Sequence, residues 1–193
     1  MLETTRMTDD LVIALGRGHV DQDEAGMIGF GVIELFGPDG RLKQSRRFRN
    51  LITDAGDLYV AQKVITAISP ANPSAPTAMS GMKLGTGTTA VAKNGAGGAL
   101  VTYLAASNVA FDATYPQTSN LGAGLGVTAV YKTTWAAGVA TNAAITEAVI
   151  VNDAATNATT SAANTGSRVV FTAINKGASD TLAITWSWKY LGA

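Results

Sequence analysis

Two glutamates are the first residues whose type and placement could do chemistry. Glu34 and Glu147 both lie in segments with the sequence character of strands. Glycoside hydrolysis needs two carboxyl groups on opposite sides of one cleft, so a facing Glu34–Glu147 pair would indicate a hydrolase. The alternative, which we favour, is that each glutamate faces solvent or makes a structural hydrogen bond. We therefore expect no catalysis from this pair.

Other reactive residue types are scarce. The chain has one histidine, His19, and no cysteine, so thiolate chemistry and disulfides are excluded. His19 has Asp21 and Asp23 close in sequence, but a metal site usually needs two or more histidine or cysteine ligands at close spacing. The glycine-rich LGTGTTA (residues 84–90) lacks the lysine spacing of a phosphate loop. We expect no catalytic residue, no cofactor and no metal, and predict that the chain is not an enzyme.

Positive charge is concentrated in one stretch, RLKQSRRFRN (residues 41–50). Its basic residues are Arg41, Lys43, Arg46, Arg47 and Arg49. Such a patch is suited to phosphates, but the whole chain has 14 basic and 14 acidic residues and no net charge, which is weak support for nucleic-acid binding. We favour a protein partner with an acidic surface, such as the acidic arm of a neighbouring copy. A solvated strand face remains the alternative.

The composition favours a single β-rich body that packs against other proteins. The chain has 193 residues, which suits one domain with an arm. Only 15% of its residues are charged, against about 25% in a typical soluble protein. No apolar run reaches the roughly 18 residues of a transmembrane helix, and the chain start lacks the pattern of a secretory signal. We therefore expect no membrane association.

The first 26 residues are expected to form an extended arm. This segment holds six acidic residues against two basic ones, Arg6 and Arg17. The acids are Glu3, Asp9, Asp10, Asp21, Asp23 and Glu24. The apolar run LVIAL offers Leu11, Val12 and Ile13 to a partner. The arm either grips a neighbour through these residues or stays loose, and the sequence leaves both open.

A hairpin and a helix are predicted after the arm. Residues 27–52 form two strand-like stretches around GPDG (residues 37–40), where proline presets one turn angle and glycine accepts a positive φ. The helix is predicted over residues 53–68, with Thr53 or Asp54 as its cap. Its apolar residues recur at helical spacing: Leu58, Ala61, Ile65 and Ile68.

Short strands and turns make up the rest of the chain. Strands are predicted over residues 82–87, 99–106, 107–116, 127–135, 144–152, 167–174 and 181–190. The glycine-rich segments 93–98 and 118–126 are predicted to be loops. Residues 153–166 are small and polar, and we expect them to form an exposed loop.

The last strand has the clearest pattern. Leu182, Ile184, Trp186, Trp188 and Tyr190 alternate with small or polar residues, so they fall on one face. We expect this strand to be central, paired on both sides, with its aromatic face closing the core. The predicted fold is mainly β, with a β-sandwich or jelly-roll-like body over residues 27–193 and the arm over residues 1–26.

At four places the sequence resembles virion structural proteins of tailed bacteriophages. The segments are RNLITDAGD (49–57), MKLGTGTTA (82–90), AAITEAVIVND (143–153) and SRVVFTAINKGASDTLAITWSWKY (167–190). In that group a hairpin and helix lead into "lG.GtT", then "itEa.l.n", then "K...D.L.itW". The resemblance covers roughly residues 28–190 and leaves the arm out. The order of the four motifs carries it.

The resemblance implies a non-enzymatic component of a virus particle. The expected role is capsid decoration, in which a protein with a jelly-roll body binds the outer shell as dimers or trimers. The expected partners are the major capsid protein and other copies of this chain, at the capsid surface of a virion made in the cytoplasm of a bacterial host. The arm, residues 41–49 and the loop 153–166 are the expected contact regions.

Other roles remain open. A tail, baseplate or head-fibre component is the main alternative to capsid decoration. Carbohydrate or receptor binding is a further alternative, and exposure of Trp135 or Tyr131 in a groove would favour it.

Overall fold

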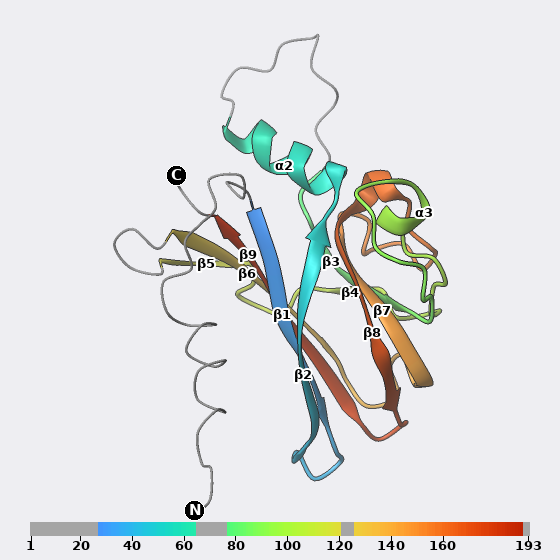
Figure 1. Cartoon of the computed structure of the whole chain (residues 1–193). Coiled ribbons are helices and arrows are strands. Elements are labelled where there is room, and N and C mark those ends of the chain that lie inside the picture. The colour runs from blue at the N-terminus through green and yellow to red at the C-terminus, as the bar shows by residue number, and fades with distance from the viewer. Residues whose placement is uncertain (1–26, 65–76, 121–125, 191–193) are drawn as a thin grey trace, which may run out of the picture.

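The computed structural model describes residues 27–64, 77–120 and 126–190. In these ranges nine strands form one antiparallel sheet, in the order β4-β3-β7-β8-β2-β1-β9-β6-β5, and the sheet curls into a half-barrel (Figure 1). The strands are β1 (Met27–Phe36), β2 (Leu42–Ile52), β3 (Gly81–Gly85), β4 (Val109–Ala110), β5 (Gln117–Asn120), β6 (Val127–Trp135), β7 (Asn142–Val151), β8 (Thr165–Lys176) and β9 (Thr181–Tyr190). The short helices are α2 (Asp54–Val64), α3 (Gly95–Gly98) and the 3-10 turn η2 (Ala162–Asn164). The predicted mainly β fold is confirmed.

The last strand lies in the middle of one half of the sheet. β9 pairs with β1 on one side and with β6 on the other. Trp186 and Trp188 are fully buried, together with Trp135 of β6. Phe48 of β2 meets Trp186 edge-on, with ring centroids 4.9 Å apart. The predicted central position of this strand and the burial of its tryptophans are therefore confirmed.

The first two strands form the predicted hairpin. The N–H of Gly40 donates to the carbonyl oxygen of Gly37 at 3.0 Å, and Gly40 has a φ of 74°. Because an L side chain is strained at that φ, glycine is the residue that this turn position favours. Pairing then runs along both strands, with Gly29 opposite Asn50 and Leu35 opposite Gln44.

The predicted helix is present, but it packs through a different face. The N–H of Gly56 donates to the Thr53 hydroxyl at 3.2 Å, which caps the start of α2. Tyr59 and Val60 pack on the core, whereas Ala61 is exposed. A Cβ at Gly56 would lie 2.2 Å from the carbonyl oxygen of Gly166, so the helix backbone sits directly against β8. Residues three and four positions apart lie on the same face of a helix, so the contact at Gly56 turns Tyr59 and Val60 toward the core. Ile65 and Ile68 lie outside the described residues.

Two strand predictions are wrong. Residues 99–106 form no strand apart from a single bridge between Gly85 and Tyr103, and residues 107–116 contain only the two residues of β4. The apolar side chains of the first segment instead build a second layer: Leu100 clusters with Val149, Val151 and Ala154 on the outer face of β7. Two predicted loops also contain regular structure: residues 95–98 form α3 within this layer (Figure 1), and residues 118–120 belong to β5, which pairs with β6.

The polar loop 153–166 is only partly exposed. Ala154 and Thr160 are buried, and the Asn157 side-chain oxygen accepts hydrogen bonds from the Tyr103 hydroxyl at 2.7 Å and the Ala106 N–H at 2.9 Å. The loop therefore belongs to the layer that covers β3, β7 and β8. The sequence-based expectation was wrong for these residues because small polar side chains can pair with other loops as well as with water.

The arm predicted over residues 1–26, with Leu11, Val12, Ile13 and His19, lies outside the described residues. In the described ranges, no helix is both long and apolar enough to cross a membrane.

Candidate functional site

Glu147 and Arg168 form a fully buried ion pair between β7 and β8. The Arg168 guanidinium donates from Nε and Nη2 to Glu147 Oε2 at 3.1 and 2.8 Å, and neither side chain is exposed. Nη1 of Arg168 donates to the carbonyl oxygens of Thr89 and Gly97, at 2.9 and 3.1 Å. A buried charge is tolerated only when it is paired and hydrogen-bonded, and both conditions are met here.

The other carboxylate contacts of Glu147 are backbone amides. Oε1 accepts from the N–H of Gly87 at 2.9 Å and of Thr102 at 2.8 Å, and Oε2 accepts from that of Val101 at 3.2 Å. A Cβ at Gly87 would lie 2.4 Å from Oε1, so this position requires glycine. The glycine-rich turn at residues 84–90 therefore binds a carboxylate of its own chain.

The two glutamates considered for hydrolysis do not share a cleft. Glu34 lies on β1 opposite Ser45 and Ala183, and its neighbours Ile33 and Leu35 turn into the core, so Glu34 points the other way. Glu147 lies on β7, and β2 and β8 separate β7 from β1 in the sheet. With its oxygens occupied and its side chain buried, Glu147 is a structural residue. No cluster of metal-ligating side chains occurs in the described part of the chain.

Two buried lysines are also satisfied by the fold. Lys83 contacts Asp153 Oδ1 at 2.9 Å and donates to the Ala158 carbonyl at 3.1 Å. Lys176 donates to the Ala136 carbonyl at 3.0 Å, and burial lowers the pKa of its ammonium. Each lysine thus ties a loop to the sheet.

Asp180 fixes the turn between β8 and β9. Its carboxylate accepts from the N–H of Gly177 at 2.9 Å and from the ammonium of Lys43 at 2.9 and 3.0 Å. The hydrogen bond from Lys43 holds the pKa of the Asp180 carboxyl below its usual value. Lys43, a residue of the basic segment 41–49, is therefore part of this turn.

A groove opens where β2 and β8 separate. The two strands pair only at Leu51–Arg168 and Ile52–Ser167, and beyond these residues they diverge (Figure 1). The groove has a volume of about 490 Å³. One wall is residues 46–49 of β2, the other is residues 170–172 of β8, and Ile33 lies between them. Three arginines and no acidic residue line it.

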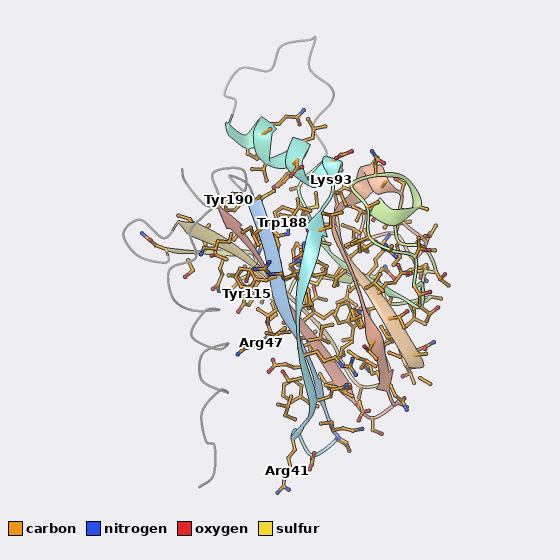
Figure 2. The ribbon with its side chains drawn as sticks, viewed as in Figure 1. Arg41, Arg47, Lys93, Tyr115, Trp188 and Tyr190 are labelled. Carbon is orange, nitrogen blue, oxygen red and sulfur yellow. The ribbon has the colours of Figure 1, made fainter. Side chains whose placement is uncertain are left out.

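The basic segment is divided by the structure. Arg41 contacts Asp39 at the exposed hairpin tip, and Lys43 is held by Asp180. Arg46, Arg47 and Arg49 reach the groove instead, and Figure 2 shows Arg47 projecting from the ribbon, well separated from Arg41. Within the described ranges, no ion pair involves Arg47 or Arg49. The sequence grouped all five basic residues, but only three of them line the groove. Arg47 and Arg49 lie on the outer face of β2, and Arg46 lies on the face that carries Ile33.

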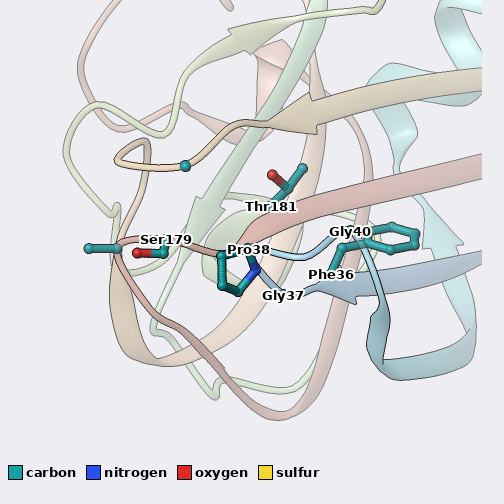
Figure 3. Close-up of a pocket in the computed structure, with 8 residues that line it drawn as sticks. Phe36, Gly37, Pro38, Gly40, Ser179 and Thr181 are labelled. Atoms are coloured by element: carbon teal, nitrogen blue, oxygen red, sulfur yellow. The ribbon is translucent and has the colours of Figure 1, made fainter.

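A second hollow, of about 570 Å³, lies between the β1–β2 turn and the β8–β9 turn (Figure 3). Pro38 and Gly40 come from the first turn, Ser179 comes from the second, and Thr181 begins β9. None of its lining side chains is ionisable, so it offers no acid or base. Trp135 and Tyr131, the aromatic residues considered for sugar binding, are buried in the core, and this removes the feature that would favour a sugar site.

Sequence reasoning missed both the groove and the Glu147–Arg168 pair. The two residues of the pair are 21 positions apart. The motif TEAVIV gives no local sign that the side chain of its glutamate points toward the layer of loops. The groove depends on where two strands distant in sequence stop pairing, and no local pattern reports that. Comparison of the chain with family models, with curated proteins and with solved structures gave no match.

Proposed function

We propose that this protein is a structural component of a tailed-bacteriophage virion that binds the capsid as a decoration protein. It makes and breaks no bond. It acts through contacts with the major capsid protein and with copies of itself, as a dimer or trimer on the capsid surface, after synthesis in the bacterial cytoplasm. We also propose that the curled sheet is a jelly-roll-like body.

The observation that carries the proposal is what the motif residues do. Thr53 in the first motif caps α2, and Gly87 in the second binds Glu147 in the third. Arg168 and Asp180 in the fourth tie β8 to the loop layer and fix the last turn. Each motif thus supplies contacts that hold the frame together. Because the residues of all four motifs stabilise the fold, the chain suits a structural role better than a catalytic one.

The surface supports a binding role. The groove between β2 and β8 combines unpaired strand edges with Arg46, Arg47 and Arg49, which suits an acidic, extended protein segment. Many copies on a lattice make weak individual contacts effective, because the second and later contacts form at a high effective concentration.

A tail, baseplate or head-fibre component is the second candidate, since the resembling motifs are shared by β-rich proteins of several particle locations. Receptor or carbohydrate binding is less supported, because Trp135 and Tyr131 are buried.

Copy number separates the two locations. In purified particles, quantitative mass spectrometry should find this chain in a fixed ratio to the major capsid protein, comparable with the number of capsid lattice positions. A copy number equal to that of the tail proteins would favour a tail component over a decoration protein. Its absence from the particles would overturn both.

A further inference from the structure

The groove leaves two strand edges unpaired. Residues 44–50 of β2 pair only with β1, and residues 169–176 of β8 pair only with β7. Exposed edges of this kind are templates for an added strand, and folds normally cover or blunt them. In the described ranges the arginines blunt the edge of β2, but nothing covers it.

We infer that this groove binds the acidic arm of a second copy of the chain, with residues 9–15 added as a strand along β2. The inference rests on the proposed function, because it specifies how copies of the chain would contact one another on the capsid. Its test uses purified protein alone.

Charge complementarity selects the arm. The groove presents Arg46, Arg47 and Arg49 and no carboxylate. Residues 1–26 carry six carboxylates against two basic residues. Asp9 and Asp10 stand directly before the apolar run of the arm, so charged and apolar groups arrive together. Complementary charge raises the rate of association and fixes the register of the added strand.

Length and side-chain type also fit. The segment DDLVIAL covers residues 9–15, the same length as the free edge at residues 44–50. Its leucine, valine and isoleucine favour a pleated, half-buried strand. Alternate apolar side chains would contact Phe48 on one wall and Val170 and Phe171 on the other, which are half-buried at present.

Strand direction favours a second copy over the same chain. Gly29 pairs with Asn50, so the start of β1 lies beside the closed end of the groove, where α2 follows. By the shortest path, the arm of the same chain would pass around that end and run parallel to β2. An arm entering tip-first from the open end runs antiparallel to β2, which is the more stable pairing with the edge that carries the arginines. Because β8 runs opposite to β2, the arm is parallel to β8, and we expect it to meet that wall through side chains only. Residues 16–26 reach at most about 36–40 Å, enough to connect neighbours.

The test reverses charge on each side of the contact in the full-length protein. One variant carries Asp9→Lys and Asp10→Lys, and the other carries Arg47→Glu and Arg49→Glu. By light scattering we expect an oligomeric wild type. Each variant alone should lose self-affinity by about tenfold or more, because like charges then face each other. An equimolar mixture of the two should associate again, because each arm then meets a groove of opposite charge.

The matched control is Lys63→Glu, which reverses an exposed charge on α2 away from the groove and should leave association unchanged. Circular dichroism establishes that each variant is folded. A monomeric wild type, variants that associate as the wild type does, or a mixture that stays dissociated would each overturn the inference.

Cross-linking provides a readout that leaves the charges intact. The chain has no cysteine, so introduced thiols are unique. Ile13→Cys on one chain should form a disulfide with Thr172→Cys on another, since Thr172 lines the groove and is exposed. Ser119→Cys, exposed on the distant strand β5, is the control partner. Equal cross-linking to positions 172 and 119 would contradict the docking. A negative result would rule out this docking of the arm, but it would not bear on whether the protein is located on the capsid.

Discussion

Glu147 illustrates how a residue that suggests catalysis is used for stability. Its carboxylate receives three backbone N–H groups and a buried guanidinium, so the polar contacts of two loops converge on one side chain. Replacing a buried pair by apolar residues can be neutral, but removing one partner leaves the other charge uncompensated. Loss of one partner of this pair should therefore lower the stability of the fold.

Glu147→Gln tests this role. The substitution keeps the shape but removes the counter-charge of Arg168, and we expect the free energy of unfolding to fall by about 3–5 kcal/mol. Urea denaturation measures it. Glu34→Gln, on the outer face of β1, is the control and should change stability by less than about 0.5 kcal/mol. Equal effects of the two substitutions would contradict the structural role of Glu147.

Asp180 gives the protein a stability contribution that depends on pH. Its pKa is lowered in the folded state, chiefly by Lys43, so the unfolded chain binds a proton more readily. The contribution is therefore complete above the unfolded aspartate pKa of about 3.9 and is lost as pH falls through the lower, folded value.

Asp180→Asn should accordingly be less stable than the wild type at neutral pH, and the difference should shrink below about pH 4. Denaturant titrations across this range measure the difference. Asp39→Asn, at the exposed hairpin tip, should change stability little at any pH. A difference between wild type and Asp180→Asn that does not vary with pH would refute this assignment.

At the scale of elements, strands with strong alternation were predictable and the loop layer was not. β6, β9 and the first hairpin follow from period-two patterns and turn chemistry, which are local. Residues 99–106 carry a similar apolar content, yet they cover the outer face of β7 because β7 is apolar on both faces. β2 and β8 are more than a hundred residues apart in the sequence, so no local sequence pattern could show where their pairing stops.

Tryptophan fluorescence tests the central position of β9. All three tryptophans are fully buried, Trp135 on β6 and Trp186 and Trp188 on β9. Native emission should be blue-shifted and resist acrylamide, and quenching should rise sharply on unfolding. Trp186→Ala should also cost about 3–5 kcal/mol, the usual loss for a large buried aromatic side chain. Free quenching in the native protein would contradict the buried face of this strand.

At the scale of the whole molecule, a stiff curled sheet with an open, arginine-lined groove suits a part that binds neighbours. The frame is held by buried ion pairs and hydrogen bonds that tie the loops to the sheet, and the groove is where strand pairing stops. This contrast between a tied interior and an unpaired edge is the physical basis of the scaffold proposal.

Cryo-electron microscopy of the parent particle would show where this protein binds. We expect density for the half-barrel at repeated positions on the outer capsid surface, in contact with the major capsid protein, with an extended segment between β2 and β8. Density for this chain confined to the tail, or no density for it anywhere on the particle, would contradict the decoration role.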